Sequence, residues 1–110
     1  VPIQCEYYAL EGLSQLIYTI NLIQERINPV LEIEGIVFTM YDARTNLSNQ
    51  VVDNVKENMH LNIYKTIIPR NVRLAEAPSY GLPIHMYDAK SAGSVAYMNL
   101  AKEVIKNNKK

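Results

Sequence analysis

The sequence has 110 residues, of which 48% are hydrophobic and 20% are charged, and its formal net charge is zero. These values predict one globular domain, and no run of about 18 apolar residues that can span a bilayer occurs. The zero net charge excludes a general electrostatic attraction to nucleic acid or to an anionic membrane. Any polyanion binding therefore has to come from a local cluster of charge.

The first part of the chain predicts a strand, a helix and a second strand. Residues 1–3 look like the end of a strand whose start is absent. Apolar residues then recur at helical spacing over residues 7–27, and Asn28 and Pro29 end this helix because proline lacks a backbone donor. Residues 36–38 are a continuous β-branched and aromatic run, which is typical of a strand covered on both faces.

A second helix and a third strand follow. A polar segment over residues 42–46 leads into a helix over residues 47–59, and a short strand over residues 63–68 ends at Pro69. Candidate N-caps for the helix are Thr45, Asn46 and Ser48.

The last part of the chain predicts a long loop and a final helix. No sustained period is present from residue 70 to about residue 91, so we predict a loop that contains a short extended piece at residues 82–84. The final helix covers residues 95–105, and we expect the lysine-rich end, residues 106–110, to be solvated.

This order of elements predicts the fold class. Strands that alternate with helices favour right-handed βαβ units, and hence an α/β fold with a parallel sheet and helices packed on it. Because the first strand looks incomplete, we expect residues 1–110 to be the carboxyl-terminal part of a single larger domain.

Three of the four arginines follow the carboxyl ends of predicted strands. These ends share one edge of a parallel sheet, where ligands of open α/β folds bind. The three are Arg44, Arg70 and Arg73. Two interpretations stay open: ion pairs with Glu6, Asp42 or Glu76 that only complete the loops, or an anion site for nucleotide phosphate or the DNA backbone. A planar guanidinium suits the second because it bonds phosphate oxygens in pairs.

Three motifs resemble the carboxyl half of the ParA/Soj chromosome-partitioning ATPases, deviant P-loop proteins related to MinD. They are IQCEYYALEGL (residues 3–13), TMYDART (residues 39–45) and IPRNVRLAEAPSYG (residues 68–81). The resemblance covers essentially the whole chain, in matching order and spacing. It implies an ATP-dependent sandwich homodimer that binds DNA non-specifically and segregates chromosomes or plasmids. It also implies stimulation by a ParB/Spo0J-type partner, no membrane binding, and a cytoplasmic, nucleoid-associated location, which agrees with a single cysteine, Cys5.

One departure from the family pattern is large. The sequence contains no G-x-x-x-x-G-K-[ST] loop to cradle phosphates, and no acidic strand to hold Mg²⁺. We therefore expect a fragment without the P-loop half that hydrolyses no ATP alone and binds no cofactor tightly. ATP and Mg²⁺ belong to the full-length protein. Such a fragment is also expected to expose a strand edge and to self-associate.

The resemblance assigns binding roles but no catalytic residue. Pro69 and Asn71 match the segment that lies against the adenine base, through a proline main chain and a polar side chain, and Met40 is a further candidate for that pocket. The arginines matched to DNA are Arg44 and Arg73, and Arg70 lies between the two sites. Asp42 is a candidate to orient Arg44.

Other polar residues favour structural roles. Cys5 has no second thiol and is expected to be buried, and His60 and His85 lack the spacing of metal ligands. The sequence leaves two other functions open. A MinD-like membrane-cycling ATPase needs a basic amphipathic helix at its C-terminus, and residues 101–108 make a poor one. A free-standing module that binds DNA or a partner needs no P-loop half.

Overall fold

The computed structural model describes residues 1–108, so Lys109 and Lys110 of the predicted solvated end lie outside the described part. In chain order the elements are β1 (Pro2–Gln4), α1 (Ala9–Arg26), β2 (Ile36–Tyr41), α2 (Asn46–Asn58), β3 (Ile63–Pro69), α3 (Val72–Glu76), the 3-10 helix η1 (Ala77–Tyr80), α4 (Ile84–Tyr87) and α5 (Ala92–Asn107). The strands form a parallel sheet in the order β1-β2-β3, which confirms the predicted α/β fold.

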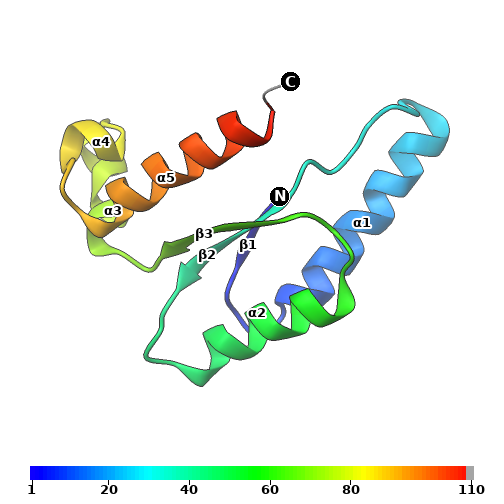
Figure 1. The fold of residues 1–110 in the computed structure, drawn as a ribbon, viewed down its shortest axis with the longest axis horizontal. Helices are drawn as coiled ribbons and strands as arrows, with labels where there is room; N and C mark the ends of the chain where they lie inside the picture. Colours follow the sequence, from blue (N-terminus) through cyan, green and yellow to red (C-terminus); the bar gives the residue numbers. More distant parts are fainter. Residues whose placement is uncertain (109–110) are drawn as a thin grey trace.

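Helices cover both faces of this sheet (Figure 1). In that view α1 and α2 lie on one side, and α5 lies on the other together with α3 and α4. Ile3 of β1 pairs with Phe38 of β2, and Tyr41 at the end of β2 pairs with Pro69 at the end of β3. All three strands therefore end at the same edge of the sheet, where the chain leaves for α1, α2 and α3.

The main core lies between the sheet and the pair α1 and α2. Its buried apolar residues are Ile3, Cys5, Leu13, Ile36, Phe38, Val51, Val52 and Val55. The valines come from one stripe of α2, and Ile36 and Phe38 are two apart on β2, so both sets follow the expected periodicities. Cys5 is buried in this core, and burial raises the pKa of its thiol, in agreement with a structural role.

Small residues let α5 approach the opposite face. Gly93, Ser94 and Ala96 of α5 are buried, as are Tyr64 and Ile68 of β3. A Cβ atom added at Gly93 would lie 2.4 Å from Cγ of Leu74, so glycine is required for the contact between α5 and α3.

The prediction of a long loop after residue 70 was wrong. This segment folds into α3, η1 and α4, each only four or five residues long, and too short to show a period in the sequence. The extended piece at residues 82–84 was also wrong, because Ile84 begins the helix α4. The second strand continues beyond the predicted residues 36–38 to Tyr41, and the last helix begins at Ala92 rather than residue 95.

One carboxylate of α5 accepts hydrogen bonds from the irregular part of β3. Between two paired positions, β2 advances from Ile36 to Phe38 while β3 advances from Ile63 to Ile67, so β3 carries extra residues there. Within that stretch the backbone N–H groups of Lys65 and Thr66 donate to the two oxygens of Glu103, at 2.7 and 2.9 Å. Glu103 therefore satisfies two donors that the sheet leaves unpaired.

None of the helices within residues 1–108 is both long and apolar enough to cross a membrane.

Candidate functional site

The carboxyl edge of the sheet brings together the two segments that carry the candidate residues. Tyr41 and Pro69 are paired across β2 and β3, and the backbone N–H of Arg70 donates to the carbonyl of Tyr41 at 2.8 Å. The segments over residues 40–44 and 69–73 therefore leave the sheet side by side, as the parallel arrangement predicted.

Arg44 is oriented by Asp42 through a paired contact. Nε of Arg44 donates to Oδ1 of Asp42 and NH2 donates to Oδ2, both at 3.0 Å, and the backbone N–H of Arg44 also reaches Oδ1 at 3.0 Å. These bonds, first from the guanidinium and then from the backbone, lower the pKa of Asp42. The Arg44 side chain is 88% exposed, so it is both fixed and accessible.

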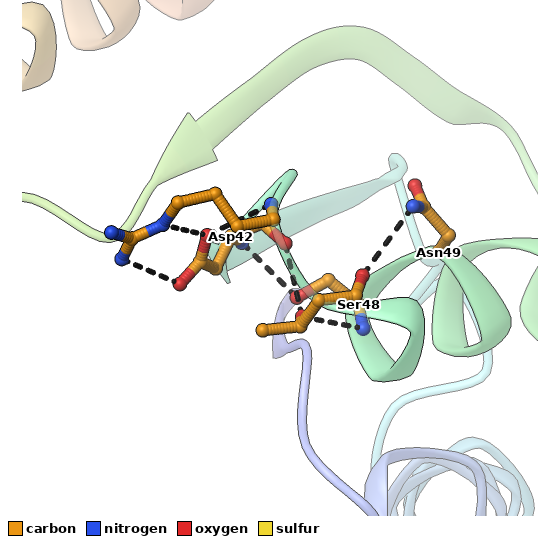
Figure 2. A network of polar contacts seen from close by, with 5 residues as sticks. Asp42, Ser48 and Asn49 are labelled. Carbon is orange, nitrogen blue, oxygen red and sulfur yellow. Dashed lines mark hydrogen bonds and ion pairs between the residues drawn. The ribbon is translucent and has the colours of Figure 1, made fainter.

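The turn that carries this pair is held by hydrogen bonds to the start of α2 (Figure 2). Oγ of Ser48, a buried side chain, accepts from the backbone N–H of Asp42 at 3.0 Å. Thr45 caps α2 by accepting from the N–H of Ser48 at 3.3 Å, and its hydroxyl donates to the carbonyl of Asp42 at 3.0 Å. Of the three candidate N-caps, Thr45 is therefore the one used, and Arg44 stands on a rigid support.

Asn71 begins α3 and has a fixed orientation. Its Oδ1 accepts from the backbone N–H of Leu74 at 3.3 Å, as an N-cap does. Because the oxygen is used in this way, the part of the side chain that stays available for a further contact is its amide NH₂ group, a donor.

A cavity of about 510 Å³ opens beside Asn71, on the face of the sheet that α5 covers. It brings together the three candidate nucleotide residues, Met40, Pro69 and Asn71, and Arg70 also lines it. Arg44 and Arg73 are not among its lining residues. The cavity thus separates the nucleotide candidates and Arg70, which line it, from Arg44 and Arg73, which do not.

Three polar residues that line this cavity were not predicted from the sequence as site residues. They are Gln4, Thr39 and Tyr97. Gln4 and Thr39 are paired across β1 and β2 and alternate with the core residues Ile3 and Phe38, so the strand period indicates their face. Tyr97 comes from α5, and only the packing of that helix on the sheet brings it here.

Met40 has an unusual backbone conformation at the mouth of the cavity. Its φ is 55°, in the left-handed region, which costs a residue with a Cβ atom about 1 kcal/mol or more. The same position interrupts the ladder, since β2 advances three residues from Phe38 to Tyr41 while β3 advances two, from Ile67 to Pro69. A strained residue that the surrounding sheet holds in place is a frequent feature of functional sites.

Arg73 lies in a cluster of acidic and aromatic side chains. Its NH1 contacts Oε2 of Glu76 at 3.2 Å, and its Nε lies 3.4 Å from Oδ2 of Asp88. The hydroxyl of Tyr87 donates to the same Oε2 at 2.5 Å. That bond, together with the charge of Arg73, lowers the pKa of Glu76.

Of the expected ion pairs, Arg44 with Asp42 and Arg73 with Glu76 are present, and Arg73 also contacts Asp88, which was not expected. Glu6 forms no ion pair, and neither does Arg70, within residues 1–108. No group of three or more His, Cys, Asp or Glu side chains in that range can hold a metal ion.

Comparisons with known proteins agree on one family. Residues 4–84 match the family described as the CobQ/CobB/MinD/ParA nucleotide binding domain. The chain is 58% identical over 97% of its length to the sporulation initiation inhibitor protein Soj of Bacillus subtilis, and covers 42% of that protein. It is 51% identical over 96% of its length to the chromosome partitioning protein ParA of Myxococcus xanthus, and covers 38% of it. The chain therefore spans about two fifths of these relatives.

A solved structure is similar over the same region. Cobyrinic acid a,c-diamide synthase from Mycobacterium smegmatis, crystallised with ADP and magnesium, superposes with a TM-score of 0.68 at 30% identity. The match covers 94% of the present chain and 35% of that protein.

Proposed function

Because the chain belongs to the CobQ/CobB/MinD/ParA nucleotide-binding family, we propose that it is the carboxyl part of an ATPase that partitions chromosomes or plasmids. The relatives are themselves named as partitioning proteins, and a similar solved structure holds ADP and magnesium. In the full-length protein, ATP and Mg²⁺ bind between this chain and a P-loop that the 110 residues do not contain.

The cavity beside Asn71 is the observation that carries this proposal. In it, the main chain of Pro69 supplies a carbonyl acceptor for the exocyclic amine of adenine. The amide NH₂ of Asn71 supplies a donor for a ring nitrogen, since its oxygen is committed to Leu74. Met40 forms part of the apolar wall around the base. These contacts orient the nucleotide, and the phosphate chemistry is left to the P-loop and Mg²⁺.

Asn71→Ser in the full-length protein tests this assignment. Serine keeps the N-cap of α3 but removes the amide donor, so we expect ATP affinity to fall about tenfold while the fold stays intact. Titration with a fluorescent ATP analogue measures the affinity. Asn71→Ala, which also loses the cap, provides a second comparison. Unchanged affinity in Asn71→Ser would contradict the role given to the base-facing amide.

The three arginines at the carboxyl edge of the sheet, here called the rim arginines, give the same protein a surface for the DNA backbone. Arg44, Arg70 and Arg73 leave one edge of the sheet, and guanidinium groups bind phosphates without reading sequence. Three arginines are too few for tight binding, so an ATP-dependent homodimer multiplies them. We propose that this dimer associates with the nucleoid in the cytoplasm, and that a ParB/Spo0J-type partner stimulates its ATP hydrolysis.

A further inference from the structure

Arg73 is held between two acidic side chains from different parts of the fold. Glu76 lies one turn further along α3, and Asp88 directly follows α4. One guanidinium between two carboxylates leaves a local charge of −1. A phosphate that approaches this corner therefore meets net repulsion.

The two contacts of Arg73 involve both of the edges through which a guanidinium binds anions. A guanidinium has two edges that bond an anion in pairs, one made by Nε and NH2 and the other by NH1 and NH2. NH1 of Arg73 donates to Glu76 and its Nε lies 3.4 Å from Asp88, so each edge of Arg73 already faces a carboxylate. Asp42 takes Nε and NH2 of Arg44, which leaves the edge made by NH1 and NH2 open.

Tyr87 fixes the acidic side of this cluster. Its hydroxyl donates to Oε2 of Glu76, the oxygen that contacts Arg73, and its ring stacks on Tyr80 with 5.0 Å between ring centroids. The cluster therefore ties α3 to η1 and α4. In agreement, the Arg73 side chain is 53% exposed, against 88% for Arg44.

We propose that Glu76 and Asp88 compete with the polyanion for Arg73, and so set the strength of DNA binding at this rim. The inference rests on the proposed function, because it assumes that the rim binds the DNA backbone. Arg44 and Arg70 make the first contacts, and Arg73 joins only when phosphate displaces its carboxylates.

Neutralising the carboxylates tests the competition. In the full-length protein with ATP, we expect Glu76→Gln and Asp88→Asn each to raise affinity for a random-sequence DNA duplex about two- to fivefold. The logarithmic salt dependence should steepen, since one carboxylate fewer is released to take up a salt cation when phosphate binds Arg73. Tyr87→Phe changes no charge but frees Glu76, so a smaller gain in the same direction is expected. Fluorescence anisotropy over a salt series measures all three.

Matched variants separate the competition from a general charge effect. Glu57→Gln makes the same charge change on an exposed residue near the end of α2, away from the rim, and should leave DNA affinity unchanged. Adding Arg73→Ala to Glu76→Gln should abolish the gain.

The possible failures are distinguishable. If Arg44→Ala and Arg73→Ala weaken DNA binding but Glu76→Gln leaves it unchanged or weaker, the carboxylates are not competitors and this inference is overturned while the proposed function stands. If the unaltered protein binds no duplex at low salt with ATP, the proposed function itself fails.

Discussion

At the scale of single residues, Asp42 and Arg44 show how closely sequence and site agree. The two are separated by one residue in a turn, so a local ion pair was expected, and the structure has it with three hydrogen bonds. Arg73 is different. Its partner Glu76 lies on the same helix, but Asp88 reaches it only because α4 forms, and α4 was not predicted from the sequence.

Arg44→Ala should weaken DNA binding by the full-length protein and reduce its salt dependence by about one unit, because one phosphate contact is lost. ATP affinity should stay near its original value, since Arg44 does not line the cavity. A salt-dependent DNA titration with and without ATP gives both quantities.

Arg26→Ala is the matched control for this change. Arg26 is an exposed arginine at the far end of α1, so its loss changes the total charge equally but should not alter binding. Equal DNA affinity in Arg44→Ala and the unaltered protein at low salt would remove Arg44 from the interface.

At the scale of elements, the long helices and the strands were predictable, and the short helices were not. α1 and α2 repeat their apolar stripe over several turns, whereas α3, η1 and α4 each hold about one turn. The irregular pairing of β2 with β3 at Met40 and at Lys65 could not be predicted from the sequence either, because it depends on contacts between strands. Residues of α3 also line the cavity, so only its Met40, Pro69 and Asn71 part was expected from the sequence.

Glu103 should make part of the stability of the sheet dependent on pH. Burial alone would raise the pKa of its carboxyl, but the N–H groups of Lys65 and Thr66 outweigh this and leave it below its ordinary value of 4.5. A carboxyl whose pKa is lower in the folded state contributes stability above the unfolded pKa, and this contribution is lost as the pH falls through the folded pKa.

Glu103→Gln should therefore destabilise the full-length protein by about 1 kcal/mol at pH 7, since an amide has one acceptor for two donors. The difference from the unaltered protein should shrink as the pH falls below 4.5, where the carboxylate itself is protonated. Urea unfolding at several pH values measures this. Glu57→Gln, on an exposed residue of α2, is the control, and a difference that is constant with pH would exclude the assigned role.

At the scale of the whole molecule, the family predicted from three motifs is confirmed by the match over residues 4–84 and by relatives at 51 to 58% identity. The parallel sheet with helices on both faces is confirmed as well.

The 110 residues alone should release no phosphate from ATP, because they lack the glycine-rich loop and lysine that hold the terminal phosphates. A phosphate-release assay on the purified chain, against a buffer blank, measures this. Activity that co-elutes with the chain through two chromatographic steps would show that catalysis needs no P-loop half.

The hydrogen bond from Arg70 to Tyr41 has a consequence for how such a protein is controlled. It connects Arg70, in the wall of the cavity, to the strand that leads into the turn bearing Arg44, and this turn is itself hydrogen-bonded to α2. The cavity and the turn that bears Arg44 are therefore joined directly by hydrogen bonds. Under the proposed function, we expect nucleotide to govern DNA contact by changing how two subunits face each other, and not by moving this turn relative to the cavity.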